Sequence, residues 1–237
     1  MKKLLLVVIM MAVSFVYINA DVYIKQETKS PEFMGTPAKS QITETWMSKT
    51  KMVTITDSQS VIVNLEDKKM TMINHKNKWY IVSALPFNFI NILPPEMAGM
   101  VEGMMKSMKM EVAPNNQTKK IGTWDAKGYD VSMNIMGMEM KMTFWVSDNV
   151  GFDYKSYSEL SYEMLKTTQY GEKMVEEFKK INGYPVAMEM SIMGMTVNTQ
   201  TLEISPEKTP DPSIFTIPAG YTLKEKLSAE DLQNMNK

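Results

Sequence analysis

Two segments of the chain carry the same tetrapeptide, Ile-Met-Gly-Met, at the centre of an alternating pattern. Residues 129–146 and 186–204 are each predicted to form a β-hairpin that turns at the Met-Gly pair. A two-residue connection fixes the register of a hairpin, and successive side chains point to opposite faces. On one face of the first hairpin the expected pairs are all apolar: Tyr129/Phe144, Val131/Met142, Met133/Met140 and Ile135/Met138. The other face is polar, so this hairpin must bury one side and hydrate the other.

The second hairpin repeats this arrangement less regularly. Its expected facing pairs are Ile192/Met195, Met190/Val197, Met188/Thr199 and Val186/Thr201. The apolar residues then move to Leu202 and Ile204, which indicates a bulge or a change of face.

Short strands with polar turns are also predicted in the first third of the chain. Apolar and polar residues alternate over several short stretches: 22–26, 41–49, 52–56, 61–65, 70–72 and 79–82. A last extended segment is expected at residues 211–221. Together with the hairpins, these segments amount to about ten strands, and short strands joined by polar turns are typical of an antiparallel sheet.

Three segments change to a helical period. In residues 94–110 the apolar side chains recur at helical spacing: Met97, Met100, Val101, Met104, Met105 and Met108. Gly99 and Gly103 weaken this helix by about 1 kcal/mol each relative to alanine. Residues 154–168 and 172–181 are the other two predicted helices. The predicted fold class is therefore α+β, a curved antiparallel sheet or incomplete β-barrel whose concave face is covered by the helices.

The first 20 residues have the pattern of a secretory signal peptide. Two lysines precede an apolar run at 4–16 that is too short to span a membrane, and the small residue Ala20 follows. We expect cleavage after Ala20, with an uncleaved anchor as the alternative because Ile18 is bulky for this position. Residues 21–227 are then expected to form a single domain and 228–237 a polar C-terminal tail, with a frayed helix as an alternative.

The chain contains no cysteine. An exported protein of this kind has no disulfides, so its stability must come from its core. Asp21 also stands where the acylated cysteine of a bacterial lipoprotein would be. The expected location is therefore the periplasm, as a soluble protein and not as a lipoprotein. A formal net charge of −1 without clustered basic residues excludes nucleic acid as an expected partner.

Four stretches of the sequence resemble the LolA-like lipoprotein-carrier superfamily, within an uncharacterised branch of secreted bacterial proteins. They are VIVNLEDKKMTMINHKNKWY at 61–80, IGTWDAKGYDV at 121–131, GYPVAMEM at 183–190 and DPSIFTIPAGY at 211–221. The resemblance implies an incomplete antiparallel barrel, closed by helices around an apolar cavity that takes acyl chains.

The sequence favours a non-catalytic protein. His75 is the only histidine, and it lies in the polar turn 74–78, where a surface role is expected. A serine nucleophile would depend on that one histidine, and neither a cysteine nucleophile nor a glycine-rich phosphate loop is present. No cofactor is expected.

Methionine is the compositional anomaly, with 26 residues in the chain. Because its thioether side chain is flexible and polarisable, methionine suits a surface that adapts to different ligands. We therefore predict a carrier for a lipid or another apolar small molecule, with a membrane or envelope protein as a further candidate partner. The expected cavity wall consists of Val63, Met70, Met72, Phe87, Phe89, Met100, Met104, Met133, Met138, Met140, Met188 and Met190.

Two alternatives remain open from the sequence. The same residues could pack together with no space left, which would make the protein a structural or protein-interaction module of the cell envelope. The Met-x-Met runs could also bind Cu(I), a soft ion that accepts thioether ligands. The spacing of these runs is also what a strand with one buried face requires, so no metal ligands are assigned.

Overall fold

The computed structural model describes residues 22–32, 37–155, 158–159, 161–162, 171–192 and 194–234. These residues form the strands β1 (Val22–Ser30), β2 (Lys39–Met47), β3 (Lys51–Ile55), β4 (Gln59–Asn64), β5 (Lys69–Asn74), β6 (Trp79–Ala84), β7 (Lys109–Ile121), β8 (Trp124–Ile135), β9 (Met138–Ser147), β10 (Tyr184–Ile192), β11 (Met195–Ser205) and β12 (Thr222–Leu223). The signal peptide expected at residues 1–20 lies outside the described residues.

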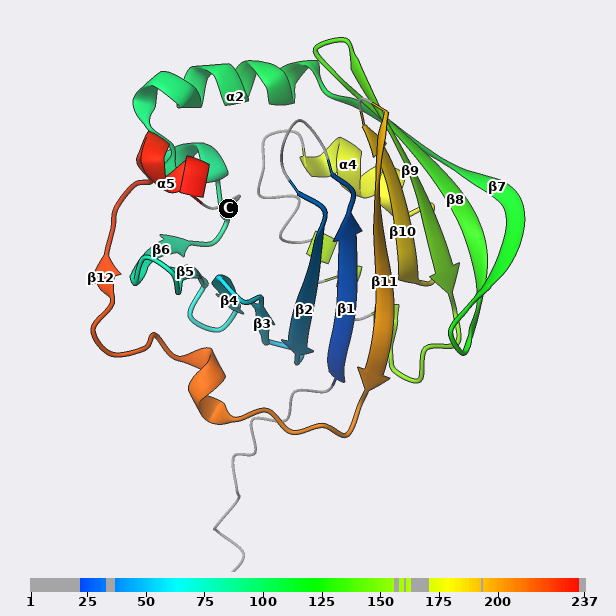
Figure 1. Ribbon diagram of the computed structural model, residues 1–237, viewed down its shortest axis with the longest axis horizontal. Coiled ribbons are helices and arrows are strands. Elements are labelled where there is room, and N and C mark those ends of the chain that lie inside the picture. The colour runs from blue at the N-terminus through cyan, green and yellow to red at the C-terminus, as the bar shows by residue number, and fades with distance from the viewer. Residues whose placement is uncertain are drawn as a thin grey trace, which may run out of the picture.

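All twelve described strands belong to one sheet, in the order β12-β6-β5-β4-β3-β2-β1-β11-β10-β9-β8-β7. The sheet is strongly curved, and it is not closed because β12 and β7 lie at its two ends (Figure 1). Neighbours are antiparallel except β12 and β6, which run parallel. β1 pairs with both β2 and β11, so the first strand joins the N-terminal half of the sheet to the two hairpins.

The predicted register of the first hairpin is confirmed. β8 and β9 pair Tyr129 with Phe144, Val131 with Met142, Met133 with Met140 and Ile135 with Met138. Met136 and Gly137 have φ angles of 52° and 86° at the connection. Positive φ at both central residues is what the favoured two-residue hairpin turn requires.

The second hairpin is confirmed in the ladder between β10 and β11. It pairs Met188 with Thr199, Met190 with Val197 and Ile192 with Met195. The predicted irregularity near Leu202 is also present. β1 pairs Lys25 with Glu203 and Gln26 with Thr201, so Leu202 is skipped and forms a bulge. Leu202 is consequently exposed, while Thr201 beside it is buried.

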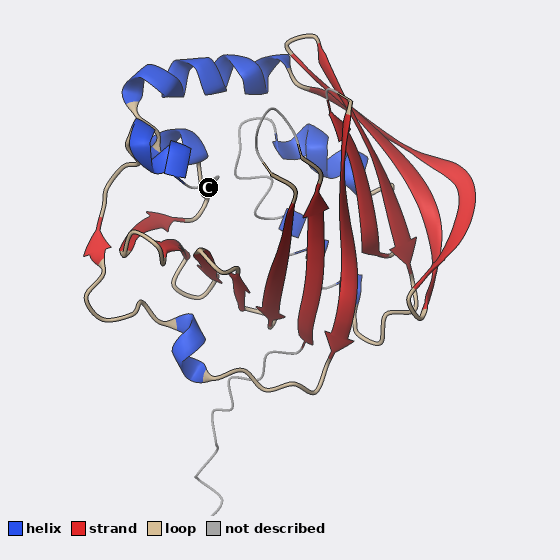
Figure 2. Ribbon diagram, in the orientation of Figure 1, coloured by secondary structure: helices blue, strands red, loops and turns tan. Residues whose placement is uncertain are grey.

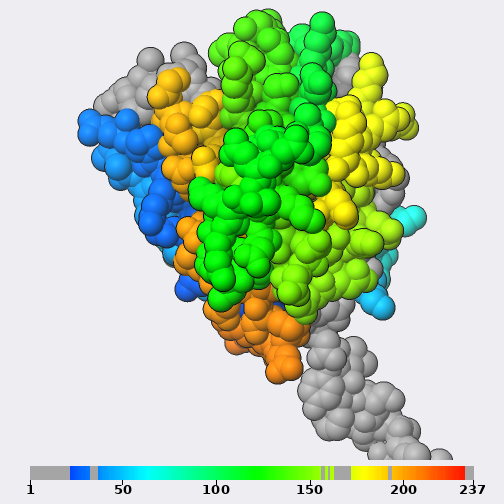
Figure 3. Space-filling view, turned by 90° about the vertical axis from the view of Figure 1, so that its right-hand side faces the viewer, coloured from blue at the N-terminus to red at the C-terminus, as the bar shows by residue number. Residues whose placement is uncertain are grey.

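The strand count is higher than the ten expected, chiefly because β7 was not among the predicted strands. β7 carries few apolar residues, so it lacks the alternation that identifies a half-buried strand. It pairs only with β8 and forms an edge, where lysine and Pro114 are tolerated because one side needs no partner strand. β7 crosses the middle of the face shown in Figure 3.

Helices lie mainly around the open side of the curved sheet (Figure 2). They are η1 (Phe89–Ile92), α2 (Pro95–Ser107), α4 (Gly171–Phe178), η2 (Pro212–Phe215) and α5 (Ala229–Asn234). α2 confirms the helix predicted at 94–110, but none of its residues is buried. That α2 covers the concave face of the sheet therefore stays a prediction. Within the described residues, no helix has the length and apolar character needed to cross a membrane.

The other helix predictions have mixed outcomes. α4 confirms the helix expected at 172–181, with slightly different ends. The helix expected at 154–168 is present in its described residues, 154–155, 158–159 and 161–162, and the rest lies outside them. The segment 211–221 is not extended throughout. It begins with η2, because Asp211 accepts a hydrogen bond from the Ser213 backbone and Pro212 suits the first helical position.

The N-terminal half of the sheet is buried on both faces. On the outer face, a core of Tyr23, Trp46, Val53, Ile62 and Ile73 is covered by side chains of the C-terminal segment: Ile214, Phe215 and Tyr221. On the inner face, Trp79 and Ile81 pack with Ile92 and Leu227. Lys224 anchors α5 through its ion pair with the buried Asp231, whose two carboxylate oxygens lie 2.7 Å from the ammonium. This half is a closed core.

Candidate functional site

A cavity of about 290 Å³ lies on the concave side of the sheet. It is bordered by β2, β9, the start of β10, α4 and the helical residues of 154–162 that the structure describes. The apolar part of its wall comes from Met47, Phe144, Phe178, Ile181 and Pro185. This volume is at the lower end of the range for small-molecule sites, which are mostly apolar and concave.

Aromatic rings shape the cavity. The hairpin register places Phe144 on the concave face, and its ring meets the Phe178 ring of α4 edge to face with centroids 6.3 Å apart. Tyr184 similarly contacts Phe152, with centroids 5.3 Å apart. Gly183 lets β10 approach β9 closely, since a Cβ at this position would lie 2.8 Å from the Ser147 carbonyl oxygen.

The polar groups of the cavity are neutral. Among the described lining residues there is no charged side chain, and the polar atoms belong to threonine, serine and tyrosine. Burial raises the pKa of the Tyr184 phenol and also that of the Tyr162 phenol, so both remain protonated at neutral pH. The Tyr162 hydroxyl donates a hydrogen bond of 3.4 Å to the Phe178 carbonyl. The cavity can therefore solvate an uncharged, apolar group.

A second pocket, of about 520 Å³, adjoins the cavity. The two share Tyr154, Ser158, Tyr162 and Ile181 in their walls. The second pocket adds Lys155, Glu159, Lys179 and Asn182, so it is polar where the cavity is apolar. We call the first pocket the inner cavity and the second the vestibule.

None of the twelve residues predicted as the cavity wall lines the inner cavity. Val63 and Met70 are buried in β4 and β5, while Met72, Phe87 and Phe89 pack around the inner core near Trp79. Their role as ligand contacts stays a prediction.

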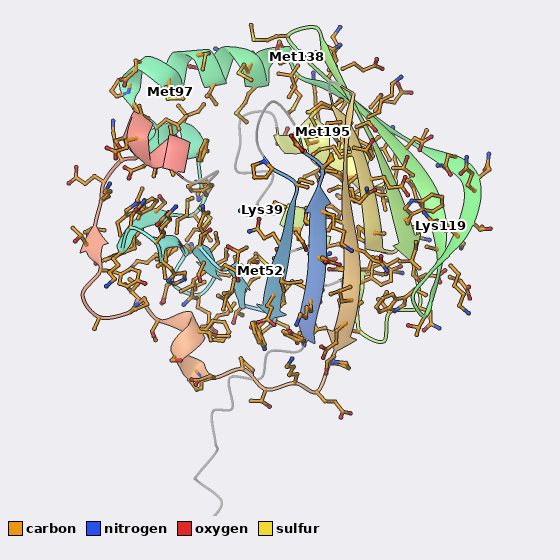
Figure 4. All side chains as sticks on the ribbon, in the orientation of Figure 1. Lys39, Met52, Met97, Lys119, Met138 and Met195 are labelled. Carbon is orange, nitrogen blue, oxygen red and sulfur yellow. The ribbon has the colours of Figure 1, made fainter. Side chains whose placement is uncertain are left out.

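The remaining predicted residues lie nearer the hairpin tips. Met133, Met140, Met188 and Met190 are half-buried and continue the face to which Phe144 belongs. Met104 on α2 is half-buried, whereas Met100 on the same helix is 56% exposed. Met138 is 50% exposed and lies at the hairpin end beside α2, far from Met52 on β3 (Figure 4).

Several residues of the inner cavity escaped the sequence analysis. Phe144 belongs to the apolar face predicted for the first hairpin, and Phe178 lies in the helix predicted at 172–181. Both signals are present in the sequence, but the methionine content favoured other positions. Met47, Tyr162 and Tyr184 come from separate parts of the chain, and only the fold brings them together.

His75 links the β5–β6 turn to the C-terminal segment. Its Nε2 lies 2.7 Å from the Ser60 hydroxyl and its Nδ1 lies 3.0 Å from the Tyr221 hydroxyl. Burial lowers the pKa of the His75 imidazole. Ser60 on β4 is buried beneath this contact. His75 therefore connects the sheet to the C-terminal segment that covers its outer face. Within the described residues, no group of three or more His, Cys, Asp or Glu side chains could hold a metal ion.

Comparison with known proteins gives a family and several distant structures. A family model described as "Domain of unknown function (DUF4412)" matches residues 96–221. No curated protein matches the sequence. The structure of PNGF-II is similar with 12% identity and a TM-score of 0.40, over 90% of this chain and 32% of that one. This chain thus spans about a third of that protein's length.

Two further structures agree with the sequence resemblance. A LolA superfamily protein from Nitrosomonas europaea shares 7% identity at a TM-score of 0.33, over 84% of this chain and 91% of that chain. A putative outer membrane lipoprotein-sorting protein domain from Vibrio parahaemolyticus shares 11% identity at a TM-score of 0.33, over 82% and 88%. The first of these belongs to the superfamily that the four sequence motifs resemble.

Proposed function

For this chain, which belongs to the family described as a domain of unknown function (DUF4412), we propose a function drawn from its own geometry. The protein binds an apolar ligand, such as a lipid or acyl chain, on the concave side of its sheet. The observation that supports this most directly is the inner cavity, whose described lining is apolar or neutral throughout. Each methylene group that moves from water into such a site contributes about 0.8 kcal/mol to binding.

The structure of the wall suits a ligand that varies in shape. Beyond Phe144, the concave face continues into half-buried methionines, including Met140, Met188 and Met190. Methionine side chains change rotamer readily and fill irregular space. A longer acyl chain would extend from the inner cavity along this face. Of the predicted wall residues, Met133, Met140, Met188 and Met190 would then take part as an extension of the site.

We further propose that the protein works in the periplasm after removal of residues 1–20. N-terminal sequencing of the protein recovered from a periplasmic extract tests this, with Asp21 as the expected first residue. A mature chain that begins at Met1 would contradict it. A membrane or envelope protein that supplies or receives the ligand remains a candidate partner.

The binding proposal is tested by substitution within the inner cavity. Ser158→Trp places a bulky ring where a small side chain lines both pockets. We expect it to weaken binding of the neutral fluorescent probe N-phenylnaphthylamine at least tenfold, or by about 1.4 kcal/mol. Ser191→Trp, at an exposed position on β10 outside both pockets, serves as the control and should bind as the wild type does.

Native mass spectrometry of periplasmic material complements this test. A bound lipid that dissociates on denaturation supports the carrier function. If the wild-type protein carries no lipid and the probe does not bind, the packed structural module is the better description.

A further inference from the structure

The vestibule differs from the inner cavity in charge. Lys155, Glu159 and Lys179 all contribute to its wall, so two cationic residues and one anionic residue border the vestibule. The Lys179 ammonium lies 6.0 Å from the centroid of the Tyr162 ring. Tyr162 lines both the vestibule and the inner cavity. The Lys179 side chain is therefore placed at the boundary between the polar and the apolar compartments.

Asn182 adds a further donor to the vestibule. The Tyr154 hydroxyl donates a hydrogen bond of 3.2 Å to the Asn182 side-chain oxygen. Because this bond occupies the oxygen of the amide, the Asn182 amide nitrogen remains as a donor toward its surroundings. Ammonium and amide N–H groups both favour an acceptor with negative charge, and such hydrogen bonds are stronger than neutral ones.

We propose that the ligand is an anionic single-chain amphiphile, with its tail in the inner cavity and its carboxylate or phosphate head in the vestibule. The proposal rests on the function proposed above and names the class of ligand. The head would accept hydrogen bonds from Lys155, Lys179 and Asn182, while Tyr162 and Ile181 form the passage between head and tail. Glu159 opposes the two lysines and limits the preference for a negative head.

The experiment measures displacement of N-phenylnaphthylamine from the full-length protein by three competitors with the same ten-carbon tail: undecanoate, decyl phosphate and decanol. An anionic head should lower the competitor concentration needed for half displacement by about five- to tenfold relative to decanol. The anion that displaces at the lower concentration identifies the preferred head.

Paired variants locate the effect. Lys155→Gln/Lys179→Gln should remove the preference for the anions and leave displacement by decanol unchanged. Lys173→Gln/Lys226→Gln changes the net charge equally at exposed positions outside both pockets, so it should keep the preference. Glu159→Gln should strengthen it by about twofold, because it removes the opposing carboxylate.

The possible failures are distinct. If the probe binds the wild type but decanol displaces it as well as the anions do, or if the lysine variants keep the preference, the anionic head is wrong and the apolar site stands. If the probe does not bind the wild type at all, the proposed function itself falls. Circular dichroism on each variant establishes that a loss of preference comes from folded protein.

Discussion

The two halves of the sheet have opposite characters although they share one curved surface. In β1–β6 the core consists of branched and aromatic residues, and Val53, Val63 and Ile81 are each at most 2% exposed. In the hairpins of β8–β11 the concave face is rich in methionine, and most of these side chains are only half-buried. Branched residues have few rotamers and define a rigid core. Methionine side chains adapt to irregular space and specify a single packing arrangement poorly. The difference indicates that the first half holds the fold while the second remains adaptable.

The strongest test of this comparison is a truncation in the closed core. Ile81→Ala should lower the free energy of unfolding by about 3 kcal/mol, since it leaves a cavity in a packed site. Met140→Ala, on the half-buried hairpin face, should cost about 1 kcal/mol because less area is lost from a partly hydrated site. Urea denaturation measures both values. Equal losses would show that the two halves are packed alike.

A smaller effect is expected at the hairpin turn. Gly137 has a φ angle of 86°, so Gly137→Ala should destabilise the protein by about 1 to 2 kcal/mol. Gly99→Ala in α2 is the matched comparison, because a Cβ there meets no atom within 4 Å. It should stabilise the protein by up to about 1 kcal/mol, through helix propensity. Thermal unfolding followed by circular dichroism gives the sign of each change, and a stabilising Gly137→Ala would contradict the turn geometry.

The outer cover of the first half should respond to pH. Burial holds the pKa of His75 below its ordinary value of 6.5, so the folded state resists a proton that the unfolded state accepts. The contribution of His75 to stability is therefore complete above pH 6.5 and decreases as the pH falls below it.

Urea midpoints between pH 7.5 and pH 5.5 measure this effect. His75→Gln should show a flatter dependence than the wild type across the same range, because it cannot take up the proton. Identical slopes for the two proteins would show that the imidazole bonds to Ser60 and Tyr221 carry no such linkage.

The smallest effect is predicted for the methionines themselves. The double substitution Met138→Leu/Met140→Leu should change stability by about 0.5 kcal/mol or less, because volume is conserved and Met138 is largely exposed. It should also leave the probe affinity nearly unchanged. Competition with a Cu(I) chelator provides the contrasting measurement, since tight Cu(I) binding that disappears in this variant would favour the copper alternative.

The sequence predicted local structure well where one physical rule dominated. The register of the first hairpin follows from its two-residue turn and from the alternation of side chains between the two faces of a strand. Its residue pairs could therefore be derived from the amino-acid sequence alone. β7 could not be derived this way, because an edge strand needs no apolar alternation. The inner cavity was missed for a different reason. Met47, Phe144 and Phe178 are far apart in the chain, and their convergence depends on the curvature of the whole sheet.

The position of β1 between β2 and β11 has a consequence for how the chain reaches its native state. The Gln26 side chain donates to the Thr201 hydroxyl across 175 positions of sequence. Chain synthesis proceeds from the N-terminus, so β1 is made early and its second partner strand, β11, is made late. Contacts between such distant segments form slowly because a long loop must close first. Until then β1 exposes unpaired backbone groups, the kind of edge at which newly made chains aggregate. A chaperone that binds the unfinished chain is therefore expected to reduce aggregation until the second hairpin is complete.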